Sequence, residues 1–158
     1  MKIRRVVVNR RKAQFELITA NGREYPFPFS LLRPKLIAPD RIVEAYPDPE
    51  LGKECFTFTR ASGEEDSIHL DTVLEYNRDP HYMSEMALYD LTCRAQDRIA
   101  GCGLSRREIA RRLGTSLPQL YRLLDPTNYS KSIDQMIALL YVLGCEVSIA
   151  VKTRKSAA

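Results

Sequence analysis

The chain has 158 residues, of which 44% are hydrophobic, and a formal net charge of +4, so it is long enough for one or two domains with hydrophobic cores. Its longest apolar run, Met136 to Leu143, is too short to span a membrane, and the apolar run after the basic N-terminus is too short for a signal peptide. The sequence therefore predicts a cytoplasmic protein that does not insert into a membrane.

The charge is unevenly distributed along the chain. Residues 1–38 carry a net charge of +7, residues 39–90 carry −9, and residues 91–158 carry +6. This basic–acidic–basic layout indicates segments with different partners.

Cysteine and histidine do not form a metal-binding pattern. The four cysteines include no CxxC pair, and His69 and His81 lack the spacing of a ligand pair. We therefore expect no metal and no cofactor, and thiols that stay reduced in the cytoplasm.

The first half of the chain predicts short strands. Residues 13–19 alternate, with Phe15, Leu17 and Thr19 on one face. Asn21-Gly22 predicts a hairpin turn, because both residue types accept positive φ. Further strands are expected at 3–8, 23–29, 42–46, 55–60 and 67–70. With a brief helix capped by Asp71, these elements predict one small antiparallel sheet.

This first region resembles a small bacterial domain family of unknown function. The matching residues are Asn21-Gly22-Arg23, the loop 47–51 and Ile68-His69-Leu70-Asp71, within residues 1–78. The resemblance implies a fold and no catalytic residues.

A polar cluster ending in proline, Asn77-Arg78-Asp79-Pro80, predicts a domain boundary. We therefore expect a small α+β domain over residues 1–80 and a second domain over residues 81–158. The second domain is expected to open with a long helix over residues 84–100 that Ser84 caps.

The next stretch predicts two short helices around a tight turn. Ser105 is expected to cap the first helix in a capping box with Glu108, and Gly114 to end it. Ser116 is expected to cap the second helix.

Leu120 and Leu123 give the second of these helices an apolar face. Two short helices joined by a glycine turn form a helix-turn-helix, whose second helix can enter the DNA major groove. The alternative is an ordinary helical hairpin.

The end of the chain predicts one more helix and one strand. Ser132 and Gln135 form a capping box before a leucine-rich helix that Gly144 closes. Residues 146–152 alternate and predict a C-terminal strand. That strand either pairs with the same strand of a second subunit or rejoins the first domain.

The second region resembles the lambda-repressor-like, or XRE, helix-turn-helix family over residues 84–145. The resemblance rests on Arg106, Ala110, Gly114, Leu120, Leu123, Ser132-Ile133-Asp134 and Leu143-Gly144. It implies an α+β protein in which a four-helix DNA-binding domain with a C-terminal strand follows the small antiparallel sheet. One departure is Leu117-Pro118, where family members often begin the recognition helix with a polar residue.

The resemblance carries DNA contacts onto particular positions. The predicted DNA-binding residues are Ser105, Arg106, Arg107, Ser116, Leu117, Gln119, Tyr121, Arg122, Tyr129 and Lys131. Arg122 is expected to contact guanine, Gln119 adenine and Leu117 a thymine methyl. The others suit phosphate or sugar contacts. Exposed arginines, however, often only aid solubility, and the Tyr121 ring could instead pack against the loop that follows its helix.

These features predict a sequence-specific regulator that binds double-stranded DNA as a homodimer. One form of such a regulator is an antitoxin-like autorepressor with a toxin partner. The alternative is a protein-interaction module without specific DNA binding. The basic stretch over residues 4–12 is either a strand edge that pairs with the acidic middle segment or a supplementary DNA contact. We expect no enzyme, since the sequence has no nucleophile–base pair, metal set or phosphate-binding glycine loop.

Overall fold

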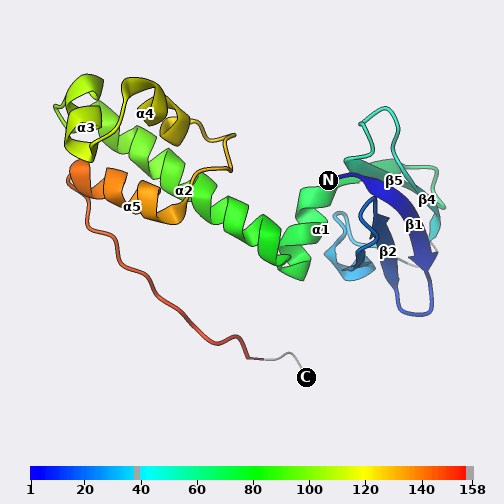
Figure 1. Ribbon diagram of the computed structural model, residues 1–158. Coiled ribbons are helices and arrows are strands. Elements are labelled where there is room, and N and C mark those ends of the chain that lie inside the picture. The colour runs from blue at the N-terminus through cyan, green and yellow to red at the C-terminus, as the bar shows by residue number, and fades with distance from the viewer. Residues whose placement is uncertain (38–39, 156–158) are drawn as a thin grey trace. The chain divides into compact units, whose positions relative to one another are not determined.

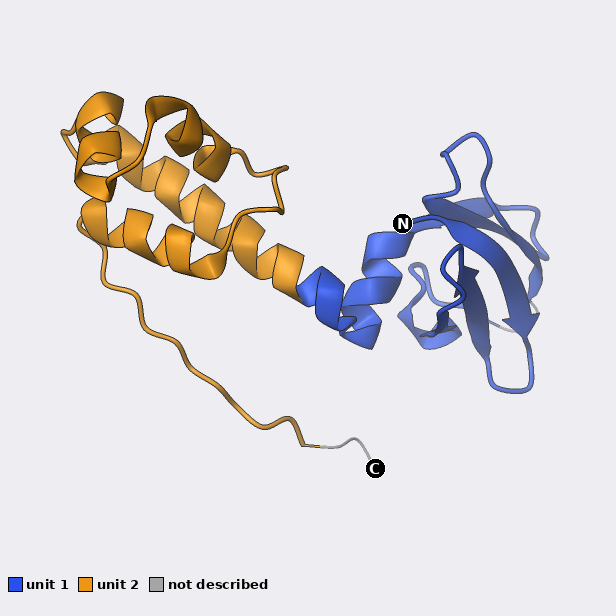
Figure 2. Ribbon diagram, viewed as in Figure 1, with its two compact units in different colours: residues 1–83 blue, residues 84–158 orange. Residues whose placement is uncertain are grey.

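The computed structural model describes residues 1–37 and 40–155 and has an α+β fold. The chain divides into two compact units, Met1–Met83 (unit 1) and Ser84–Ala158 (unit 2), as Figure 2 shows. The sequence places the boundary slightly earlier, between residues 80 and 81. Within the described residues, no helix is both long and apolar enough to cross a membrane.

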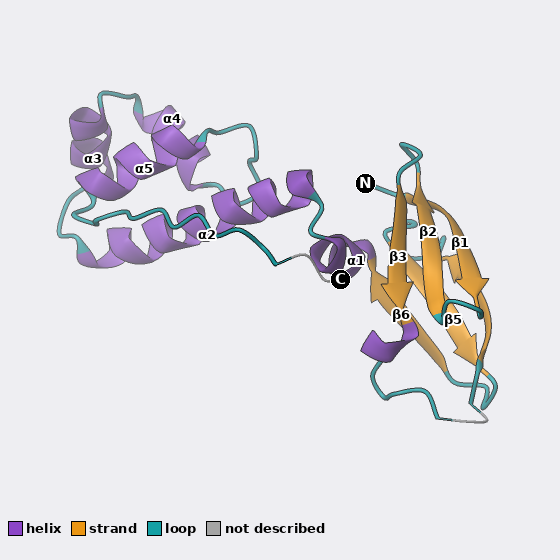
Figure 3. Ribbon diagram, turned by 90° about the horizontal axis from the view of Figure 1, so that it is seen from below, coloured by secondary structure: helices purple, strands orange, loops and turns teal. Residues whose placement is uncertain are grey.

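Unit 1 contains two antiparallel sheets of three strands each, where the sequence predicts a single sheet. The first sheet has the order β1-β2-β3, as Figure 3 shows. The second sheet has the order β4-β5-β6. The strands are β1 Ile3–Asn9, β2 Gln14–Thr19, β3 Glu24–Pro28, β4 Ile42–Pro47, β5 Cys55–Arg60 and β6 Glu65–His69. A 3-10 turn, η1, covers Phe29–Leu31.

The predicted alternation of β2 is confirmed, because Phe15, Leu17 and Thr19 are all fully buried. The predicted turn follows, but only Gly22 adopts a positive φ, of 83°, and Asn21 does not. The ring of Phe15 lies 4.8 Å from that of Phe56 and 5.3 Å from that of Phe58, between ring centroids. Strands β2 and β5 therefore join the two sheets through an aromatic core, a contact that local alternation does not reveal.

Helix α1 spans Leu70–Asn77 and packs on β3, where the Asn77 side-chain amide donates to the Pro26 carbonyl at 2.9 Å. The expected cap Asp71 is wrong, because His69 occupies the N-cap and its Nδ1 accepts from the Asp71 N–H.

Helix α2 spans Pro80–Gly101, so it begins before the expected Ser84. The Asp79 carboxylate accepts from the Tyr82 N–H at 3.0 Å, and its carbonyl accepts from the Met83 N–H at 2.9 Å. Asp79 is thus the N-terminal cap, and Pro80 follows it at a position where a missing N–H costs little. The polar cluster from Asn77 to Pro80 therefore contains the end of α1 and the start of α2.

Three further helices complete unit 2: α3 Arg106–Leu113, α4 Leu117–Leu124 and α5 Ile133–Val142. They lie against α2 (Figure 1), around a core to which each of the four helices contributes. Its most buried members are Ala95, Ile109, Leu120, Met136 and Leu139.

The predicted C-terminal strand does not form within this single chain. Residues 145–155 form no helix or strand, and Ile149 and Val151 are 73% and 92% exposed. A strand needs a partner for its backbone groups, and this chain supplies none there among the residues described.

Candidate nucleic-acid interface

The α3–turn–α4 segment follows from its capping residues. The Ser105 hydroxyl accepts from the Glu108 N–H at 3.2 Å, and the Ser116 hydroxyl accepts from the Gln119 N–H at 3.3 Å. Gly114 ends α3 with a left-handed φ of 71°, which few other residues adopt cheaply. The two helix starts and the turn between them are as the sequence predicts.

The expected capping box at Ser105 does not form. The Glu108 carboxylate instead accepts from Arg111 at 2.6 Å and from Arg112 at 2.7 Å. These two arginines lower the pKa of Glu108 to about 2. Both arginines are therefore engaged within α3, which leaves them less available to an external anion.

One face of α4 is buried and the opposite face is open. Leu120 and Leu123 lie in the core of unit 2, at 0% and 2% exposure. Pro118, Tyr121 and Arg122 are exposed on the other side. Their spacing is that of a single helix face. Leu117 is half-buried beside this face.

Gln119 lies to one side of the exposed face. It is half-buried and lines a cleft of about 290 Å³ between α4 and α5 with Asp134 and Gln135. Pro118, which is not among the predicted DNA contacts, is more exposed than Gln119. The spacing of the leucines already contains this information, since Pro118 lies opposite Leu120 and Leu123 on a helical wheel.

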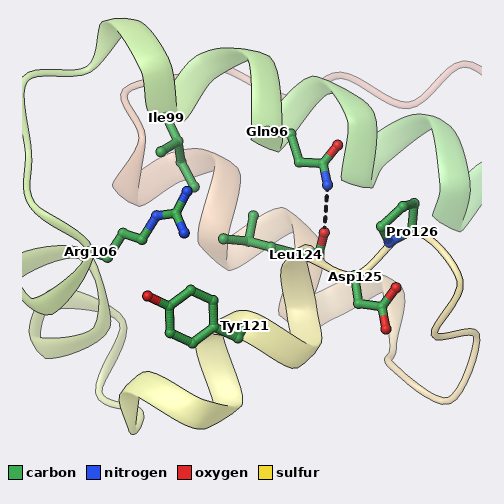
Figure 4. A pocket seen from close by; sticks show the side chains of 7 residues that line it. All are labelled: Gln96, Ile99, Arg106, Tyr121, Leu124, Asp125 and Pro126. Atoms are coloured by element: carbon green, nitrogen blue, oxygen red, sulfur yellow. Dashed lines mark hydrogen bonds between the residues drawn. The ribbon is translucent and has the colours of Figure 1, made fainter.

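Arg106 and Tyr121 come together across a pocket of about 470 Å³, shown in Figure 4. The guanidinium carbon of Arg106 lies 5.4 Å from the centroid of the Tyr121 ring, within the range of a cation–π contact. Both residues stay exposed. The ring therefore lies against a cation at the start of α3, in a pocket that the loop residues Asp125 and Pro126 also line.

The pocket's inner wall ties α4 to α2. The Gln96 side-chain amide donates to the Leu124 carbonyl at 2.8 Å, as the dashed line in Figure 4 shows. Carbonyls at the end of a helix lack partners within it, so this bond stabilises the end of α4 and fixes its position on α2. Sequence reasoning missed Gln96, because its partner is 28 residues away.

Lys131, which the sequence predicts as a phosphate contact, is buried. Its side chain is only 6% exposed, and its ammonium donates to the carbonyls of Leu123 at 2.9 Å and Asp125 at 2.6 Å. Burial lowers the pKa of Lys131. The lysine therefore completes the C-terminus of α4 and presents no free charge to a phosphate.

The loop after α4 is held by its own polar side chains. The Asn128 amide donates to the Arg122 carbonyl at 3.1 Å, and the Ser130 hydroxyl donates to the Asn128 side-chain oxygen at 2.6 Å. The Thr127 hydroxyl and N–H hold the pKa of Asp125 below its ordinary value. Tyr129, another predicted contact, is 40% exposed on this loop.

The remaining predicted contacts lie at the surface of unit 2. Ser105, Arg107 and Ser116 are exposed at or near the starts of α3 and α4. Helix N-termini carry partial positive charge and unpaired N–H groups that suit phosphate oxygens.

The basic stretch of unit 1 is partly used inside that unit. Arg10 donates to the Val43 carbonyl of β4 at 3.0 Å, and Lys12 pairs with Glu16 at 3.5 Å. Arg4, Arg5 and Arg11 are exposed. Across the described ranges 1–37 and 40–155, no cluster of His, Cys, Asp and Glu is placed to hold a metal ion.

No protein-family model matches this chain, and no curated protein matches it.

Proposed function

We propose that unit 2 is a sequence-specific DNA-binding domain of the lambda-repressor-like type, and that the protein is a transcriptional regulator. The observation that carries the proposal is the two-sided burial of α4, with Leu120 and Leu123 inside and Tyr121 and Arg122 outside. A helix of this kind, presented by a preceding helix and tight turn, fits the major groove.

In this proposal Arg122 reads a base, because it is the exposed side chain on α4 with a planar pair of donors that fits guanine. Arg106 and Arg107 at the start of α3, with Ser105 and Ser116, contact phosphates and set the register. Tyr129 contacts the backbone from the loop after α4. Gln119 and Leu117 contribute from the edge of the exposed face.

The test is selection of bound duplexes from a random pool by the full chain, at a fixed salt concentration. We expect one enriched sequence motif, with two half-sites about one helical turn apart, roughly 10 base pairs, when a dimer binds. A pool that shows no enrichment overturns the proposal.

Arg122→Ala then tests the orientation of α4. It should weaken binding to the selected duplex by about 1–3 kcal/mol and relax base preference at one position. Arg112→Ala is the matched control, since that arginine is held by Glu108 at 2.7 Å, and it should change affinity little. Unchanged affinity in Arg122→Ala would show that α4 is turned differently.

A second candidate function is a protein-interaction module, and unit 1 supplies the observation for it. Val43, Tyr46 and Leu51 expose 48%, 37% and 48% of their surface. Burial together with nearby carboxylates raises the pKa of Tyr46. An acidic surface with apolar side chains suits a basic protein partner, such as a toxin in an antitoxin-like regulator. Binding of a partner without any enriched duplex would favour this function.

A further inference from the structure

The segment after α5 combines an extended backbone with a regular alternation. Residues 145–155 adopt no helix or strand, while Val147, Ile149 and Val151 recur at every second position. Val147 is half-buried and packs against the core of unit 2, whereas Ile149 and Val151 are 73% and 92% exposed. Three β-branched residues on one face favour a strand, yet the strand has no partner in this chain among the described residues.

The sequence of this segment is complementary to itself. Residues 146–152 read Glu-Val-Ser-Ile-Ala-Val-Lys. If two copies pair antiparallel about a two-fold axis at Ile149, Val147 lies opposite Val151 and Glu146 lies opposite Lys152. Each end of the paired ribbon then carries a pair of opposite charges, and cross-strand pairs of this kind are favourable.

The same register sorts the two faces of the ribbon. The valines and isoleucines of both copies lie on one face, and Glu146, Ser148, Ala150 and Lys152 lie on the other. A slip by one residue would turn the apolar set to the opposite face, and other slips would separate Glu146 from Lys152. Self-complementary contacts of this form are what a two-fold dimer requires.

Unit 2 offers a support for the apolar face. A ribbon of two strands alone is marginally stable in water. Here Val147 already packs on the core. The segment also borders a cleft of about 670 Å³, in which Leu91 and Leu140 lie among the charged side chains of Asp90, Arg94, Asp97 and Arg98. Pairing brings Val151 of the second copy beside the anchored Val147, so that its apolar side chain leaves water.

We propose that residues 146–152 form a dimerisation strand whose partner is the same segment of a second copy of this chain. The two strands run antiparallel and cross at Ile149, with Glu146 of each copy beside Lys152 of the other. The resulting two-fold symmetry matches a pair of half-sites, but the dimer is measured without DNA, and so this inference stands or fails separately from the proposed function.

The test measures the mass of the full chain in solution by sedimentation equilibrium over a range of concentrations. The wild type should be dimeric. Ile149→Lys should give a monomer, because it places two ammonium groups on the two-fold axis. Far-UV circular dichroism of each variant shows that the helices remain, which is expected since Ile149 is exposed in the single chain.

Charge reversal makes the test specific to the register. Glu146→Lys and Lys152→Glu should each raise the dimer dissociation constant at least about tenfold, since like charges then face each other. The double variant Glu146→Lys/Lys152→Glu should restore wild-type association. Arg154→Glu, which makes the same charge change as Lys152→Glu beyond the paired residues, should have little effect.

Two results would overturn the inference. A wild type that is monomeric at every concentration shows that the segment does not pair with a second copy, including the case in which it rejoins unit 1. A dimer that survives Ile149→Lys and shows no rescue in the double charge reversal uses another surface.

Discussion

Particular cations of the two units have different surroundings. In unit 1, Arg60 is 2% exposed and donates to the Pro34 carbonyl at 2.9 Å, while Arg23 pairs with Asp79 at 3.1 Å. In unit 2, Arg106 and Arg122 are exposed on the surface beside the α3–α4 turn. A local excess of positive charge therefore does not by itself identify a surface that faces a phosphate.

The difference follows from the backbone. Loops and strand edges leave carbonyls without partners, and the donors of an arginine can satisfy them. A helix satisfies its own carbonyls except in its last turn. Lys131 of unit 2 is used in the same way as the arginines of unit 1, because its ammonium donates to the carbonyls of Leu123 and Asp125 at the end of α4.

The largest expected effect separates the two units. Leu120→Asp buries an unpaired carboxylate in the core of unit 2 and should destabilise that unit by about 4 kcal/mol. Hydrogen exchange of the full chain should show amide protection lost across α3, α4 and α5 and retained in the strands of unit 1. Arg122→Asp places the same group on the exposed face of α4 and is the matched control. Equal loss in both variants would contradict the assigned faces of α4.

A smaller effect is expected when the buried Lys131 is replaced. Lys131→Ala leaves two carbonyls at the end of α4 without their donor and should lower the free energy of unfolding by about 2 kcal/mol. For whichever duplex the selection identifies, it should leave the salt dependence of binding unchanged, whereas Arg107→Ala should reduce the slope by about 1. A reduced slope in Lys131→Ala would mean that this ammonium faces the DNA.

The buried carboxylate of Asp79 in unit 1 predicts a pH effect. The Tyr82 N–H, and then the Tyr25 hydroxyl and Arg23, hold the pKa of Asp79 below its ordinary value of 3.8. A carboxyl whose pKa is lowered by folding stabilises the fold above its unfolded pKa, and this contribution is lost as the pH falls through the folded value.

Asp79→Asn should therefore cost about 1.5 kcal/mol at neutral pH and should flatten the loss of stability below about pH 4. Thermal unfolding measured as a function of pH checks both effects. Asp97→Asn, at an exposed position of α2, is the control. An acid dependence that is unchanged in Asp79→Asn would assign it to other carboxylates.

The smallest expected effect concerns the contact between Tyr121 and Arg106 in unit 2. If the Tyr121 ring holds Arg106 in place for a phosphate, Tyr121→Ala should weaken duplex binding by about 1 kcal/mol, and Tyr121→Phe, which keeps the ring, should not. The double variant with Arg106→Ala should lose less than the sum of the two single losses. Strict additivity would show that the two side chains act independently.

Features that depend on a few neighbouring residues could be read from the sequence. Ser105, Ser116 and Gly114 stand at the ends of α3 and α4 as predicted, and the alternation of β2 identifies its buried face. Caps, turns and amphipathic faces are set by residues within one or two turns of one another, and so a linear pattern contains them.

Other features depended on contacts between distant residues. The Tyr25 hydroxyl donates to Asp79 across 54 positions of sequence, and this contact belongs to a helix start that resembles a linker when read alone. The division into two sheets, the burial of Lys131 and the approach of Arg106 to Tyr121 are of the same kind. Composition and charge specify which groups can interact, but only the tertiary structure determines which carbonyl, carboxylate or ring each cation reaches, because burial and distance set the strength of those interactions.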